Sequence, residues 1–66
     1  MKYQVGDLAR WNQDHRVRNE SIMLITKIID DPKTFGYYEY TYLETGRTDH
    51  YVDHSYESDT KLLEEQ

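Results

Sequence analysis

The segment from Asp49 to His54 holds the densest group of side chains that could carry chemistry, with two aspartates, two histidines and a tyrosine. Histidine and carboxylate side chains are common zinc ligands and common general bases. On an extended strand, however, His50 and His54 lie roughly 13 Å apart, because each residue advances the chain by about 3.3 Å. That separation is too large for one metal ion, so we expect surface histidines and no metal site.

No other motif indicates catalysis or a cofactor. Gly6, Gly36 and Gly46 are isolated glycines, so the chain has no glycine-rich phosphate loop, and no serine lies in a nucleophile motif. The chain has no cysteine, which excludes a thiol nucleophile and a cysteine-bound zinc ion. A domain this small rarely encloses the preformed pocket that an enzyme needs. We therefore predict a protein that is not an enzyme and binds no cofactor.

The charge balance limits the class of partner. The chain has 13 Asp and Glu against 8 Lys and Arg, a net charge of −5. Binding to a phosphate backbone needs clustered cations, so this balance argues against broad nucleic-acid binding and favours a protein partner. The only locally basic segment is His15-Arg16-Val17-Arg18. We interpret it as part of a polar loop from Asn12 to Glu20, where Arg16 and Arg18 could contact a partner.

The acidic side chains of the turns and the C-terminal tail have two interpretations. They could simply keep the protein soluble. They could also form an acidic docking face for a basic partner, and such a face could mimic DNA.

The aromatic side chains outnumber what a small core needs, with seven tyrosines, one tryptophan and one phenylalanine. Tyrosine suits such a core because its ring can be buried while its hydroxyl reaches the edge. The alternating pattern assigns four aromatic residues to the core: Trp11, Tyr38, Tyr40 and Tyr42. Exposed tyrosines are enriched at protein interfaces and on base-stacking surfaces. Four others are expected to be part-exposed and to contact a partner: Tyr3, Tyr37, Tyr51 and Tyr56.

A β-hairpin from Phe35 to Val52 is the best-defined element that must position these side chains. Its tyrosines recur at every second position from residue 38 to 42, which is typical of a strand with one buried face. The segment Glu44-Thr45-Gly46-Arg47 then interrupts the run. Gly46 can adopt a positive φ at no steric cost, so we expect a tight turn before a return strand from Thr48 to Val52.

Three further strands and one helical turn complete the predicted fold. The strands cover Leu8 to Trp11, Ser21 to Asp30 and Thr60 to Leu63, with a bulge or sharp bend near Thr26 where the apolar alternation slips. Ser and Asp between residues 53 and 59 favour one helical turn. The sequence thus predicts a single all-β domain over residues 1–66, a small five-stranded SH3-like barrel with one short helical turn before the last strand.

Four segments carry a family resemblance: Val5-Gly6-Asp7-Leu8-Ala9-Arg10-Trp11, Ile25-Thr26-Lys27-Ile28, Tyr38-Glu39-Tyr40 and Leu43-Glu44-Thr45-Gly46-Arg47. They resemble very small SH3-like proteins of tailed phages, notably phages of marine cyanobacteria. The chain departs from that pattern at Met23, where a glycine is expected, and at Tyr42, where a tryptophan is expected. The resemblance implies an SH3-like fold and a phage setting. It implies no activity and no functional residues.

We therefore predict a non-catalytic protein–protein interaction module, a small adaptor or modulator in the cytoplasm of an infected host cell. One alternative is a small nucleic-acid-binding barrel that uses Arg16, Arg18, Tyr37 and Tyr51. Another is a minor structural component of the virion. The longest apolar run, from Ile22 to Ile25, is too short to cross a bilayer, and the first residues do not resemble a signal peptide.

Overall fold

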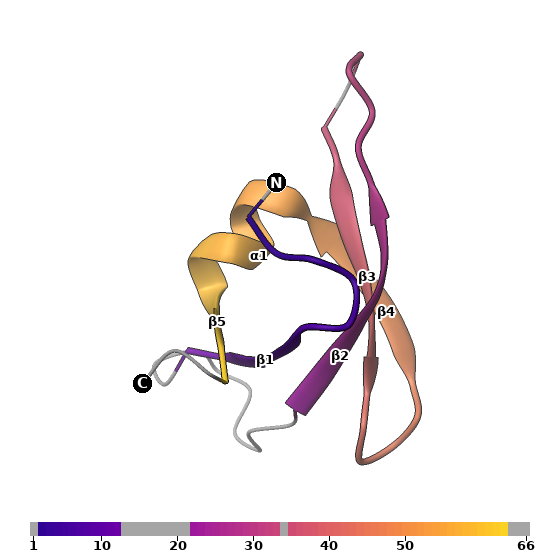
Figure 1. The fold of residues 1–66 in the computed structure, drawn as a ribbon, viewed down its shortest axis with the longest axis vertical. Coiled ribbons are helices and arrows are strands. Elements are labelled where there is room, and N and C mark those ends of the chain that lie inside the picture. The colour runs from indigo at the N-terminus through magenta and orange to yellow at the C-terminus, as the bar shows by residue number, and fades with distance from the viewer. Residues whose placement is uncertain (1, 13–21, 34, 64–66) are drawn as a thin grey trace.

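The structure is a computed structural model that describes residues 2–12, 22–33 and 35–63. Within these residues the elements are β1 (Leu8–Trp11), β2 (Ile22–Ile29), β3 (Tyr37–Tyr42), β4 (Thr48–Val52), α1 (Asp53–Asp59) and β5 (Thr60–Leu62). The strands form one antiparallel sheet in the order β4-β3-β2-β1-β5 (Figure 1). This arrangement confirms the predicted all-β, five-stranded fold with one short helix before the last strand.

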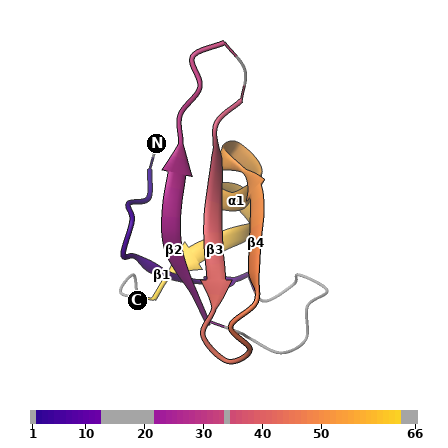
Figure 2. The ribbon, with the colours of Figure 1, turned by 90° about the vertical axis from the view of Figure 1, so that its right-hand side faces the viewer.

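The sheet curls but does not close through its two edge strands, because β4 and β5 are not paired in the described part of the chain. Helix α1 connects these two strands and packs against β3, β4 and β5. Figure 2 shows β2, β3 and β4 side by side with α1 behind them. The sheet therefore has an inner face, which α1 covers, and an outer face, which α1 leaves uncovered. Among the described residues, no helix has the length and apolar content that a bilayer crossing requires.

The turn between β3 and β4 has the predicted geometry. The Tyr42 amide donates to the Arg47 carbonyl at 2.9 Å, and the Gly46 amide donates to the Tyr42 carbonyl at 2.7 Å. Gly46 has a φ of +77°, which confirms the predicted positive φ at this position. This conformation allows the chain to reverse direction after Tyr42.

Replacing Gly46 with valine is expected to destabilise the domain by about 1–2 kcal/mol, the cost of a left-handed conformation for a residue with a side chain. The cost comes from the backbone, because no atom lies within 4 Å of the position that a Cβ would take. Gly46→Asn is the matched control, since asparagine tolerates this region. Urea denaturation of both variants measures the difference, and equal stabilities would contradict the argument.

A bulge in β2 lies where the sequence predicted it. The β2–β3 register shifts between Ile25 and Lys27, and the Thr26 hydroxyl donates to the Glu39 carbonyl at 3.2 Å. Beyond the bulge, Lys27 is opposite Glu39 and Ile28 is opposite the buried Tyr38. The extra residue thus keeps the lysine on the outer face and returns an isoleucine to the inner face.

The core on the inner face consists largely of tyrosine. Its buried apolar and aromatic residues are Tyr3, Ala9, Trp11, Met23, Ile25, Tyr38, Tyr40, Tyr42 and Tyr56. The predicted burial of Trp11 and of the alternating tyrosines is confirmed. Buried polar atoms have partners: the Trp11 indole N–H, for example, donates to the Tyr42 hydroxyl at 3.3 Å. Among the described residues, no buried side-chain nitrogen or oxygen lacks a hydrogen bond.

Val5 and Leu8 are apolar residues that lie outside this core. Both are exposed. Leu8 is opposite Leu24 in the ladder and alternates with the buried Ala9, so it belongs to the outer face. Val5 precedes the turn at Gly6 and lies outside the strand pattern.

Candidate interaction surface

The prediction that Tyr3 and Tyr56 are part-exposed is wrong. Tyr3 is 2% exposed and Tyr56 is 0% exposed. The Tyr3 amide donates to the Tyr38 hydroxyl at 3.0 Å, and the two rings are 5.5 Å apart. Tyr56 projects from α1 onto the sheet, where its ring stacks on Tyr40 at 4.8 Å with an interplanar angle of 17°. Both side chains are therefore structural and cannot contact a partner.

Tyr37 and Tyr51, the next two predicted contact residues, are both half-buried but lie on opposite faces of the sheet. Tyr51 is opposite Tyr38 in the β3–β4 ladder and so belongs to the inner face. Its ring is 6.0 Å from that of Trp11, and its hydroxyl donates to the Asp59 carboxylate at 3.2 Å. Tyr37 is opposite Val52 and belongs to the outer face. Only Tyr37 is thus placed on the surface that α1 leaves uncovered.

The other two predicted contact residues, Arg16 and Arg18, lie outside the described residues. The same holds for most of the polar loop from Asn12 to Glu20.

Two ring pairs near the Tyr37–Val52 end of the β3–β4 ladder form a surface that we call the aromatic patch: Phe35, Tyr37, His50 and His54. Phe35 is 69% exposed, and its ring is 5.5 Å from that of His54. The Tyr37 and His50 rings are 5.4 Å apart. His50 and His54 are exposed, as the sequence predicted. The patch therefore presents four planar side chains, two of them imidazoles, in two successive ring pairs along the chain.

The β3–β4 ladder brings these four rings together. Glu39 is opposite His50, so the Tyr37 and His50 side chains are diagonal neighbours on the outer face. The Asp53 amide donates to the Gly36 carbonyl at 3.0 Å, which continues the pairing past the end of β3. Phe35 and His54 flank this bond, one residue along each chain, and their rings are in contact. The β2–β3 connection, from which Phe35 comes, projects beyond the rest of the domain (Figures 1 and 2).

The histidines of the patch do not form a metal site in the described part of the chain, where no group of three or more potential ligands comes together. Instead each histidine has an aspartate beside it in the sequence. The Asp53 carboxylate accepts a hydrogen bond from the His54 amide and lies 3.3 Å from the His54 Nδ1 atom. The Asp49 carboxylate accepts a hydrogen bond from the His50 amide at 2.8 Å. The imidazoles are therefore exposed planar side chains, each with its ring tilted against a neighbouring aromatic ring.

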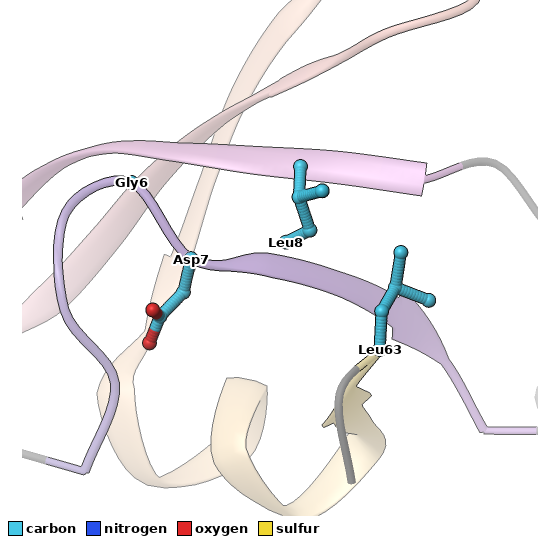
Figure 3. Close-up of a pocket in the computed structure, with 4 residues that line it drawn as sticks. All are labelled: Gly6, Asp7, Leu8 and Leu63. Atoms are coloured by element: carbon cyan, nitrogen blue, oxygen red, sulfur yellow. The ribbon is translucent and has the colours of Figure 1, made fainter. Parts of the chain in front are cut away.

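A pocket of about 280 Å³ lies elsewhere, between the turn at Gly6 and the C-terminal end of β5. Its lining residues are Gly6, Asp7, Leu8 and Leu63. In Figure 3 the Leu8 and Leu63 side chains point the same way, while the Asp7 carboxylate points away from them. That carboxylate accepts a hydrogen bond from the Gln4 amide at 2.9 Å. The described residues of its lining thus do not provide the convergent polar groups of a catalytic or cofactor site.

The described surface offers groups for three kinds of contact: ring contacts, cation–π attraction and hydrogen bonding to carboxylates. The aromatic patch offers groups for all three kinds of contact. No protein-family model, no curated protein and no solved structure matches this chain.

Proposed function

We propose that this protein is a non-catalytic protein–protein interaction module, a small adaptor or modulator whose contact surface is centred on the aromatic patch. The observation that carries the proposal is the exposure of Phe35, at 69%, in contact with the His54 ring and two residues along the chain from the Tyr37–His50 pair. Exposed apolar clusters of this kind mark interaction sites. Aromatic side chains have few rotatable bonds, so they lose little entropy when a partner covers them. The partner is a host or phage protein, met in the cytoplasm of the infected cell.

Capture from an extract of host cells tests the proposal when the wild type is compared with two variants. Phe35→Ala/Tyr37→Ala removes one ring from each pair of the patch. Leu43→Ala is the matched control, because Leu43 is 54% exposed and follows the opposite end of β3. We expect the wild type and the control to retain the same proteins, and the double variant to lose them. Retention of the same proteins by a folded double variant would refute the proposed contact surface.

The nucleic-acid alternative is tested directly by titrating labelled single- and double-stranded DNA and RNA at about 0.15 M salt, the physiological value. With a net charge of −5, the protein releases few counterions from a phosphate backbone. We therefore expect no saturable binding tighter than about 1 μM, the strong end of non-specific affinities. Tighter binding that weakens steeply with added salt would overturn the adaptor proposal in favour of the basic loop.

A further inference from the structure

We infer that the edge of β4 that faces away from β3 is a strand-pairing surface for a second copy of this chain, and that the Asp49 carboxylate blocks it. In the described part of the chain, no strand pairs with this edge, which we call the unpaired edge (Figure 2). Thr48, Asp49 and His50 are exposed along it. An exposed edge strand is a template for pairing with another chain. The other edge strand, β5, has only three residues and offers less to pair with.

The ladder with β3 determines which backbone groups point to the unpaired edge. In an antiparallel ladder, residue pairs that exchange hydrogen bonds alternate with pairs that do not. The Asp53 amide donates to the Gly36 carbonyl, so the β4 residues that bond β3 are every second one counted back from Asp53. The backbone groups of the alternate residues point away from β3. These residues are Thr48, His50 and Val52.

Asp49 occupies the central donor of this edge. Its carboxylate accepts a hydrogen bond from the His50 amide at 2.8 Å. Asp49 is opposite Tyr40 in the ladder, so the side chain belongs to the inner face. Inward-pointing charges on edge strands protect against pairing, as do proline, lysine and bulges. β4 contains no proline and no lysine, and its described register with β3 is regular, so Asp49 is the residue that supplies this protection.

A second copy fits the unpaired edge because β4 is complementary to itself. An antiparallel pair with a two-fold axis at His50 places Thr48 opposite Val52 of the second copy, and the two His50 residues exchange backbone hydrogen bonds. Outer-face side chains then lie beside outer-face side chains, so the two sheets continue as one. In this register the two Asp49 side chains are diagonal neighbours on the inner face. Asp49 therefore opposes pairing twice, by repulsion between like charges and by its bond to the central amide.

Analytical ultracentrifugation of the full chain over a range of protein concentrations tests the inference. Asp49→Ala removes the charge and the competing acceptor, and the exposed position should tolerate alanine. We expect this variant to lower the Kd of the dimer by about 30-fold, because each copy releases one His50 amide and a net hydrogen bond accounts for about fivefold. Glu44→Ala is the matched control, since it removes an exposed carboxylate from the turn before β4 and should leave the Kd at the wild-type value.

Amide hydrogen exchange, measured by NMR on Asp49→Ala, locates the contact. The amides of Thr48, His50 and Val52 should exchange more slowly as the protein concentration rises, because they become the donors between the two copies. The Tyr51 amide bonds β3 and should be protected at every concentration.

A proline at position 48 provides a second check. The Thr48 amide points away from β3, and proline is tolerated at the first residue of a strand, so the ladder with β3 should remain. Asp49→Ala/Thr48→Pro should lose most of the gain in association. Circular dichroism shows whether this variant is folded, and the exchange measurement gives its answer without it.

Three results would overturn the inference. Equal Kd values for the wild type and Asp49→Ala, or an equal decrease in Glu44→Ala, would refute the role of Asp49. Tighter association of Asp49→Ala without protection of Thr48, His50 and Val52 would refute the β4 edge as the contact. Undiminished association of a folded Asp49→Ala/Thr48→Pro variant would refute it as well. These experiments contain only this chain, so they do not depend on a partner of the aromatic patch.

Discussion

Raising the pH above about 10, the ordinary pKa of tyrosine, is expected to unfold this protein in one cooperative transition. Burial raises the pKa of three core tyrosines well above that value: Tyr38, Tyr40 and Tyr56. For Tyr38, the hydrogen bond that its hydroxyl donates to the Glu57 carboxylate adds to the effect of burial on the pKa. For Tyr40 and Tyr56, neighbouring tyrosines add to it, because ionised rings would repel each other.

The direction of the pH dependence follows from proton linkage. Between pH 10 and the raised pKa values, the unfolded chain loses protons that the folded chain keeps, so stability falls as pH rises. Below pH 10 all three groups are protonated in both states, and their contribution to stability is fully present. Each tyrosine lowers the free energy of unfolding by about 1.4 kcal/mol per pH unit, so three lower it by about 4 kcal/mol per unit. A stability of about 5 kcal/mol, the low end for natural domains, would be exhausted within about two pH units.

Tyrosinate absorbance and circular dichroism, recorded on the same samples as pH rises, measure this effect. The buried tyrosines should ionise together with the loss of the β-sheet signal. Tyr40→Phe removes one of the three groups. The free energy of unfolding of this variant should therefore fall by about 1.4 kcal/mol less per pH unit than that of the wild type. Ionisation of every tyrosine near its ordinary pKa, with the sheet intact, would contradict the assignment of these rings to the core.

The hairpin and the bulge could be predicted because local patterns specify them. Alternation from Tyr38 to Tyr42 fixes which face of β3 is buried, and Gly46 supplies the conformation that its turn requires. The slip of alternation at Thr26 marks the extra residue in β2. In each case the signal lies within a few residues of the feature.

The burial of Tyr3 and Tyr56 could not be predicted in this way, because it depends on contacts that are distant in the sequence. Tyr3 precedes the first strand and shows no periodicity, yet its hydroxyl hydrogen-bonds Thr60, 57 residues away. Tyr56 lies in a helix of seven residues, too short to display an apolar stripe. Its burial follows from the way the β4–α1–β5 segment crosses the inner face.

The aromatic patch could be predicted from the sequence only in part. Tyr37 was a predicted contact residue, whereas Phe35 and the histidines were not. The β3–β4 register, continued beyond the pair Tyr37–Val52, leads to the neighbouring pair Phe35–His54. The sequence of the hairpin predicts this pairing only when the length of the turn at Gly46, which sets the register, is known.

Replacing Tyr56 with alanine is expected to destabilise the domain by about 3–5 kcal/mol, the usual cost of deleting a buried aromatic ring. The Tyr56 ring lies between 4.8 and 5.8 Å from the rings of four other core residues: Tyr3, Trp11, Tyr38 and Tyr40. Its removal would leave a cavity where α1 meets the sheet. Small domains have little stability in reserve, so Tyr56→Ala should be largely unfolded at 25 °C. Urea denaturation followed by circular dichroism measures the loss.

Two matched variants distinguish the loss of the Tyr56 ring from other causes of destabilisation. Tyr56→Phe keeps the ring and loses only the contact of the hydroxyl with the Met23 sulfur, at 3.6 Å, so it should cost about 1 kcal/mol or less. Tyr37→Ala deletes a half-buried ring on the outer face and should cost clearly less than Tyr56→Ala, because less apolar surface is lost from the interior. If Tyr56→Ala cost no more than Tyr37→Ala, Tyr56 would be accessible enough to return to the candidate contact residues. The aromatic patch would then no longer be the best-supported interaction surface.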